Sequence, residues 1–380
     1  MDGFQDVAAV PAGVIDAIAT RADAHDRDGS FPLDSLAALH SAGLLALTVP
    51  ARLGGGGGGL RRAVELVGAV GGACASTALI LSMQLIHQHR LADDAVLPAT
   101  LRDRIGLDAV ADGALVNSLR VEPALGTPAR GGLPDTIACR TETGWRISGH
   151  KIYSTGAPGL RWFMVWARTD EPEPRTGSFA VPANTPGLRI VESWDHLGLR
   201  ASGSHDVILT DVEIPAAYAG ELRPSEGWRA IDPQTLVWHS VLTGALYTGV
   251  ARAARDWVVT FLHARKPANL GAALATLPRM QEAVGAIEER LTVNAALIEQ
   301  AVRAADAGMP LSGLTLNLFK TTIAENAVRA VEQALVLTGN HGLSRINPLE
   351  RYWRDVLCAR VHTPQADSVH LAAGRAALGL

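Results

Sequence analysis

Apolar residues in the first third of the chain follow a helical spacing. From Val7 to Ala111 they recur three or four positions apart, which predicts a helical unit. One helix is expected to open at residues 31–34, Phe-Pro-Leu-Asp, and to stop at the Val-Pro pair of residues 49–50.

Residues 66–86 contain no charged side chain and are about as long as a membrane span. Gly68, Gly71 and Gly72 interrupt this stretch, and several polar residues dilute it. We therefore expect two buried helices that join near Gly71 and Gly72, with a membrane segment as the alternative. The remainder of the chain favours no contact with a membrane.

A different pattern begins at residue 114 and lasts to residue 215. Short β-rich runs alternate there with turn residues, at residues 136–140, 144–149, 162–167, 177–181 and 206–209. Strands at this spacing predict a small antiparallel barrel or sandwich.

Helical periodicity returns in the C-terminal part of the chain. The expected helices are residues 238–262, 277–307 and 311–337, followed by a last helix from Pro348. Long helices with short connections are typical of a four-helix bundle. The fold class is therefore α+β, mainly α, with a helical domain (1–113), a β domain (114–218) and a bundle (219–380).

Six consecutive glycines occupy residues 54–59. Because glycine adds backbone freedom and no packing, the run predicts a flexible surface loop. A phosphate-cradling loop is the weaker alternative, since no Lys-Ser or Lys-Thr pair follows and no clear strand precedes it.

Composition and charge narrow the class of protein. The 380 residues have a net charge of −4, which gives no case for nucleic acid as a partner. Cys74, Cys139 and Cys358 have no spacing typical of disulfides or of a metal site, and we expect a reduced cytoplasmic compartment. The acidic N-terminus is unlike a signal peptide.

The most informative motifs lie near the C-terminus. They are Gly-Asn-His-Gly at residues 339–342, Pro-Leu-Glu-Arg-Tyr-Trp-Arg-Asp at 348–355 and His-Thr-Pro at 362–364. Together they resemble the C-terminal signature of the acyl-CoA dehydrogenase superfamily of flavoenzymes. At the position of that family's catalytic Glu this chain has Thr363, which cannot act as a base near neutral pH.

Three segments of the predicted β domain resemble the same family. Residues 121–127, Val-Glu-Pro-Ala-Leu-Gly-Thr, are similar to the loop that lines the flavin ring, and residues 149–156 are similar to the strand and turn that cover it. Residues 197–206 are similar to the turn before the last strand. The resemblance covers nearly the whole chain and implies the helix, β and bundle architecture.

The resemblance also implies roles for individual residues. Flavin would contact Glu122, Leu125, Gly126, Thr127, Tyr153, Ser154 and Thr155, and the substrate would contact Arg200, Ser202 and His239. A flat apolar ring with a polar rim needs aliphatic or aromatic surface and a few fixed donors, which these hydroxyls could supply. Serine and threonine in glycine-rich turns also often only cap the backbone.

The expected contacts with the tail of the cofactor depart from the family pattern. Arg265, Gly339 and Gly342 match positions that serve the adenosine half of FAD. However, Arg265 is followed by Lys-Pro-Ala-Asn instead of Phe-Gly, and the family's Gln position falls near Val336. The cofactor is therefore a flavin, with both FAD and FMN open.

Two further motifs resemble another branch of this family. The Tyr-Ser-Thr-Gly of residues 153–156 and the His-x-Pro of 362–364 are similar to two-component flavin monooxygenases such as dibenzothiophene monooxygenase. In that branch the histidine lies over the flavin, assisted by a hydroxyl and by a histidine from the N-terminal helices. The implied catalytic residues are His362, Ser154, and His87 or His89.

Three functions remain open at this point. We favour an oxygen-using monooxygenase or oxidase that acts on a small organic substrate and is supplied with reduced flavin by a separate reductase. The second is an acyl-CoA dehydrogenase-like enzyme with a relocated base, for example Asp367 or Glu350. The third is a silent flavin-binding subunit. The resemblance also implies a homotetramer or homodimer.

The histidines have simpler interpretations as well. His362 could lie near a helix C-terminus and interact favourably with the helix dipole. His87 and His89 could be interfacial or exposed. His239 falls near the family's second position for a base, but we favour a buried structural histidine beside Trp238.

Overall fold

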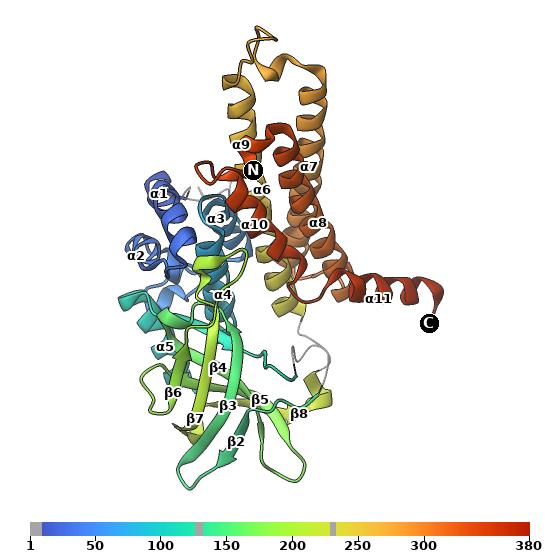
Figure 1. Cartoon of the computed structure of the whole chain (residues 1–380). Coiled ribbons are helices and arrows are strands. Elements are labelled where there is room, and N and C mark those ends of the chain that lie inside the picture. Colours follow the sequence, from blue (N-terminus) through green and yellow to red (C-terminus); the bar gives the residue numbers. More distant parts are fainter. Residues whose placement is uncertain (1–9, 126–131, 229–232) are drawn as a thin grey trace, which may run out of the picture.

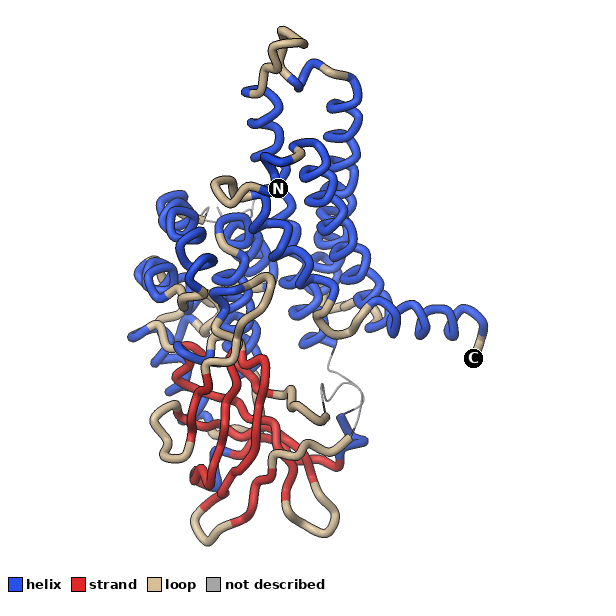
Figure 2. The backbone as a smooth tube through the Cα atoms, viewed as in Figure 1, coloured by secondary structure: helices blue, strands red, loops and turns tan. Residues whose placement is uncertain are grey.

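The computed structural model describes residues 10–125, 132–228 and 233–380. Figure 1 shows helices first, then a sheet, then a bundle of long helices. Figure 2 places the strands together at one end of the molecule and the long helices at the other. The α+β, mainly α architecture of a helical unit, a β unit and a bundle is confirmed.

The N-terminal unit consists of α1 (Ala12–Asp28), α2 (Leu33–Ser41), α3 (Leu60–Ala73), α4 (Ala75–Ala92) and α5 (Ala99–Asp112). The expected helix from residue 33 ends at Ser41, short of the Val-Pro pair. Gly43 takes a left-handed conformation (φ 72°) just after it, and residues 44–46 form only a 3-10 turn.

Helices α3 and α4 confirm the expectation of two buried helices across residues 66–86. The two helices meet at Cys74, so Gly71 lies inside α3. The backbone of α6 (Pro233–Ala264) approaches α3 closely at Gly71. A Cβ on Gly71 would come within 2.5 Å of the Leu246 oxygen, and one on Gly249 within 2.2 Å of the Gly68 oxygen. In the described ranges, no helix has both the length and the apolar character needed to cross a membrane.

The glycine run is packed, which corrects the expectation of a flexible loop. The N–H groups of Gly56 and Gly58 donate to the oxygens of Ala46 (3.0 Å) and Leu47 (2.7 Å). A Cβ on Gly55 would lie 2.3 Å from the Val49 oxygen. These glycines therefore allow two backbone segments to pack in direct contact.

The middle unit is one sheet. Its strands are β1 (Leu115–Leu119), β2 (Ile137–Arg140), β3 (Gly144–Ser154), β4 (Leu160–Thr169), β5 (Arg175–Pro182), β6 (Leu188–Val191), β7 (His205–Pro215) and β8 (Ala219–Pro224). The order is β6-β7-β3-β2-β4-β5-β8, and β1 pairs with β4.

Two pairings differ from the expected antiparallel pattern. Strands β1 and β2 both run parallel to β4 and use successive stretches of its edge, β1 at residues 160–165 and β2 at 168–169. Because β8 pairs with β5, the sheet also continues past the boundary expected at residue 218. We propose that the β domain ends in the segment before α6.

The C-terminal unit contains α6, α7 (Pro278–Asp306), α8 (Gly313–Thr338), α9 (Asn340–Leu343), α10 (Leu349–Leu357) and α11 (Ala366–Leu378). Helices α6, α7, α8 and α10 pack together as the bundle, and α11 projects away from it in Figure 1. The helix expected from Pro348 is therefore two helices. One hydrophobic core joins α3 and α4 to α6 and to the inner face of the sheet.

Candidate functional site

The turn that follows β3 holds a buried hydroxyl without a partner. The Oγ of Ser154 is buried and accepts or donates no hydrogen bond in the structure. Such a group costs free energy unless something satisfies it. Tyr153, just before it, has a positive φ of 56°, which few residues other than glycine adopt. The turn is thus held in an uncommon conformation beside an unused polar atom.

Aromatic rings form an open wall beside this turn. The Tyr153 side chain is exposed, and its ring meets Trp194 and His196 edge-on, with centroid distances of 6.2 and 6.0 Å. Trp194 and His196 stack at 3.6 Å. A flat aromatic surface next to a buried hydroxyl suits an isoalloxazine ring.

The other hydroxyls near the turn are satisfied within the protein. Thr155 Oγ1 lies 3.0 Å from Ser204 Oγ, which lies 2.8 Å from Ser202 Oγ. The Gly156 N–H donates to the Ser202 oxygen at 2.9 Å. These bonds fix the turn against residues 200–204, so Thr155 and Ser202 have an internal role in addition to the roles expected for them.

Glu122 lies in the interior as half of an ion pair. Its carboxylate accepts hydrogen bonds from Lys151 Nζ (2.6 Å), from Thr136 Oγ1 (2.5 Å) and N–H (3.1 Å), and from the Asp135 N–H (2.6 Å). The side chains of Glu122 and Lys151 are almost fully buried. The carboxylate is thus saturated and anchors the loop to β3. Leu125 follows, half-buried, while Gly126 and Thr127 lie outside the described residues.

His362 bonds to a tyrosine that the sequence analysis did not single out. The Oη of Tyr247, on α6, lies 2.6 Å from His362 Nε2. Lys320, on α8, donates to the oxygens of His362 and Pro364, the latter at 2.8 Å. Both Tyr247 and Lys320 are buried. The segment carrying His362 is therefore held by one side chain from each of two bundle helices.

Two more histidines lie near this pair. The ring of His239, on α6, meets that of His87, on α4, edge-on at 6.3 Å. His87 is buried, and its Nε2 accepts a hydrogen bond from the Ser118 N–H at 3.3 Å. His89 points elsewhere and stacks on Trp238 at 4.1 Å. Of the two alternatives, His87 is the one grouped with His239.

These histidines are surrounded by positive charge. Burial, together with the nearby Arg90 and Arg120, lowers the pKa of His239 to about 4. Burial, Lys320 and His239 lower the pKa of His362 to about 4. Burial also keeps the pKa of the Tyr247 phenol well above its usual value. Near pH 7 the cluster therefore consists of neutral imidazoles and a protonated phenol.

The carboxylates considered as relocated bases are engaged elsewhere. Glu350 pairs with Arg354 at 2.7 Å, one helical turn away. Asp355 accepts from the Leu199 N–H at 2.7 Å. Asp367 is exposed at the start of α11, and Thr363 is also exposed. None of them shifts the pKa of His362 or His239.

The remaining expected residues lie apart from the cluster. Arg200 donates to the Asp26 oxygen at 2.7 Å and so ties the turn after β6 to α1. Arg265 is exposed and directly follows α6. The C-terminal end of α6 lies at the end of the bundle away from the sheet (Figure 1). Gly339 ends α8 with φ 53°, and a Cβ on Gly342 would lie 2.3 Å from Thr338 Oγ1. Within one chain, Arg265, Gly339 and Gly342 do not contact the turn that begins at Tyr153.

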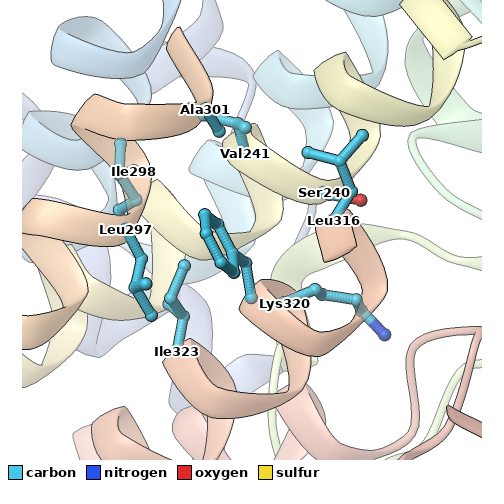
Figure 3. A pocket seen from close by; sticks show the side chains of 9 residues that line it. Ser240, Val241, Leu297, Ile298, Ala301, Leu316, Lys320 and Ile323 are labelled. Atoms are coloured by element: carbon cyan, nitrogen blue, oxygen red, sulfur yellow. The ribbon is translucent and has the colours of Figure 1, made fainter. Parts of the chain in front are cut away.

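A cavity beside Lys320 is too small for a substrate. It measures about 10 Å³ and lies between α6, α7 and α8. Figure 3 shows its apolar lining, with the amine of Lys320 directed away from Leu297 and Ile323. A volume of this size holds at most about one water molecule. The described residues also include no group of three or more side chains placed to hold a metal ion.

The described residues near Tyr153 suit the isoalloxazine ring of a flavin. The residues expected to bind the adenosine half of FAD fit that role less well. The orphan hydroxyl of Ser154 and the open aromatic face at Tyr153 suit the ring. Tyr247, Lys320 and Arg120 are the residues that motif comparison missed. The sequence around each of them contains no motif that marks the residue.

Family models match most of the chain. The N-terminal domain of acyl-CoA dehydrogenase matches residues 7–92, the middle domain residues 121–212 and the C-terminal domain residues 241–365. The putative acyl-CoA dehydrogenase YdbM of Bacillus subtilis (strain 168) is 31% identical over 90% of this chain and 89% of its own length.

Two further relatives match at a similar sequence identity, and their names or bound ligands include amino sugars. The L-evernosamine nitrososynthase of a Micromonospora species (strain ATCC 39149) is 31% identical, over 97% of this chain and 89% of its own. KijD3, solved with FMN and dTDP-3-amino-2,3,6-trideoxy-4-keto-3-methyl-D-glucose, is 32% identical. It has a TM-score of 0.83 and covers 97% of this chain and 92% of its own. FMN-bound TdsC of Paenibacillus sp. A11-2 shares the fold at 18% identity, with a TM-score of 0.82 over 96% of this chain and 95% of its own.

Proposed function

This chain belongs to the acyl-CoA dehydrogenase superfamily, and from that premise we propose that it is a flavin-dependent monooxygenase acting on a small organic substrate. The observation that carries the proposal is the bond between Tyr247 and His362, in a cluster of neutral histidines whose pKa no described carboxylate shifts. Removal of an α-proton from an acyl thioester needs a base, and these groups supply only weak ones.

The cofactor assigned to the Tyr153 turn is FMN. The Ser154 hydroxyl would bond to the polar rim of the ring, and Tyr153 would cover one of its faces. When bound in its reduced form, flavin supplies the electrons for reaction with dioxygen. The FMN reported for KijD3 supports FMN over FAD, as does the departure of residues 266–269 and Val336 from the family pattern. A separate reductase would deliver it reduced.

Proton control falls to the pair of Tyr247 and His362. Because the phenol keeps its proton, Tyr247 donates to Nε2 of His362, and the proton of the neutral ring then lies on Nδ1. That N–H can donate to an oxygen atom placed beside it and take the proton back afterwards. His87 and His239 close the other side of the cluster and, being neutral, release no proton of their own near pH 7.

A dehydrogenase with a relocated base remains the alternative, because YdbM and the acyl-CoA dehydrogenases match this chain too. A homotetramer or homodimer remains a proposal as well. It is supported by α11, which leaves the body of the chain and exposes Leu371 and Leu378.

The test supplies the FMN-loaded protein with a flavin reductase, NAD(P)H and ¹⁸O₂, together with amine, sulfide and aromatic substrates. We expect one ¹⁸O atom in a product. In His362→Asn, a larger share of the consumed oxygen should appear as hydrogen peroxide and a smaller share in product. His263→Asn is the control, because His263 is an exposed residue of the same bundle, and this share should stay as in the wild type. Unlabelled product, or equal yields from both variants, would refute the proposal.

A further inference from the structure

Arg120 is a partly buried cation without an anion. It follows β1, and its Nε is buried and makes no hydrogen bond. In the described part of the chain no ion pair joins Arg120 or its neighbour Arg90 to a carboxylate. A charge withdrawn from water without a partner is costly.

The contact that Arg120 does make recovers only part of that cost. Its guanidinium carbon lies 4.3 Å from the centre of the Trp166 ring, on the neighbouring strand β4. Such a cation–π contact leaves the edges of the guanidinium, with their N–H groups, free for an anion. The adjacent Glu122 cannot serve, because Lys151, Thr136 and Asp135 already occupy its oxygens.

Arg120 faces the histidine cluster. Two residues before it, the Ser118 N–H donates to His87, which meets His239 at 6.3 Å. Through this short chain of contacts Arg120 lies near both histidines, and its charge lowers the pKa of each. Its charge is therefore available close to the residues to which the proposed oxygen chemistry is assigned.

We propose that Arg120 binds an oxyanion of the small-molecule substrate, either a carboxylate or a phosphate, and so orients the substrate toward His362. The inference rests on the proposed function, because it assigns the substrate class of the same pocket. A planar guanidinium that is stacked on one face can still hold an oxyanion with two parallel N–H donors. The neutral histidines supply further hydrogen-bond donors, and they carry no negative charge that would repel the bound anion.

The first measurement is calorimetric binding to the FMN-loaded protein at constant ionic strength. Benzoate and inorganic phosphate are the anionic probes, and benzamide is the neutral match for benzoate. We expect saturable binding of one or both anions, with benzamide at least about tenfold weaker. Arg120→Gln should weaken anion binding by about 10- to 100-fold, and Arg120→Lys by less, since lysine keeps the charge without the fork.

Arg140→Gln is the matched control. Arg140 lies over Trp145 at 4.8 Å in the same sheet, but it is exposed and distant in the register from β1. Its substitution should leave anion binding unchanged. Equal anion affinity in wild type and Arg120→Gln, or no anion binding by the wild type, would overturn the inference.

Two readouts separate this inference from the proposed function. FMN affinity should be unaltered in Arg120→Gln, and a loss there instead of a loss of anion binding would reassign the arginine to the cofactor. In NMR titrations the same variant should raise the pKa of His239, and an unchanged value would show that Arg120 does not face the pocket. Arg120-dependent anion binding without any oxygen transfer would refute only the proposed reaction.

Discussion

The phenol oxygen of Tyr247 lies 2.6 Å from Nε2 of His362, although the two residues are 115 positions apart in the chain. This bond joins the middle of α6 to the segment after α10 and fixes the orientation of the imidazole ring. In a family known for a carboxylate base, it puts a neutral hydrogen-bonding pair in the region that we propose as the active site.

Loss of the phenol should uncouple oxygen consumption from product formation. In Tyr247→Phe the ring of His362 loses the bond that fixes it, and we expect about a tenfold smaller share of consumed oxygen in product. Oxygen uptake and hydrogen peroxide, measured together, give this share. Tyr218→Phe is the control, because Tyr218 lies in the β unit, where it packs beside Trp162. Equal coupling in both variants would remove Tyr247 from the mechanism.

Acid should destabilise the protein through His239 and His362. Burial lowers their pKa to about 4 in the folded chain, from an ordinary 6.5. Between these values the unfolded chain binds more protons, so stability is full above pH 6.5 and declines as the pH falls toward 4. The loss is on the order of 3 kcal/mol for each histidine.

Urea unfolding between pH 7 and 4.5 measures this dependence. Replacing His362 by Asn should flatten the decline, whereas replacing the exposed His263 should leave it as in the wild type. The same slope in all three proteins would show that His362 is protonated equally in the folded and unfolded states.

Breaking the buried ion pair of Glu122 and Lys151 should be costly. Glu122→Gln leaves an ammonium group in the interior without a counter-ion, and we expect a loss of about 3–5 kcal/mol in the free energy of unfolding. Glu171→Gln, in an exposed pair with Arg175, should cost at most about 1 kcal/mol. Equal costs in urea unfolding would mean that burial of the first pair is unimportant.

Removing the Ser154 hydroxyl should weaken flavin binding without harming the fold. Because this Oγ has no partner within the protein, Ser154→Ala should leave thermal stability unchanged or slightly higher. FMN affinity, followed by fluorescence quenching, should drop about 5- to 10-fold through the loss of one hydrogen bond. Ser204→Ala is the contrast, since it breaks two internal bonds and should lower stability. A Ser154 variant with full FMN affinity would place the ring elsewhere.

The sequence was sufficient for the order of helices and strands, because periodicity and turn residues are local properties. It also located Ser154 and His362, since each lies in a short motif. It was insufficient for residues 54–59, whose glycines serve contacts with residues 46–49 that only the folded chain makes. Strand direction was equally hidden, because both β1 and β2 pair with one edge of β4.

The parts of the site that were missed depend on distant contacts. Tyr247 occupies one position in an apolar helix, and nothing near it in sequence indicates a histidine partner. Arg120 adjoins a motif without belonging to it, and its lack of a counter-ion is visible only once its neighbours are placed. Composition likewise gave no sign that Glu122 would be buried in an ion pair with Lys151.

The most direct test of the account is the visible absorbance of the FMN- or FAD-loaded protein during anaerobic addition of acyl-CoA thioesters of several chain lengths. Because no described carboxylate shifts the pKa of His239 or His362, we predict that the visible absorption band of the flavin keeps its full intensity with every thioester. Rapid bleaching by any one of them would show that a base removes the α-proton, and would contradict the assignment of this site to oxygen chemistry.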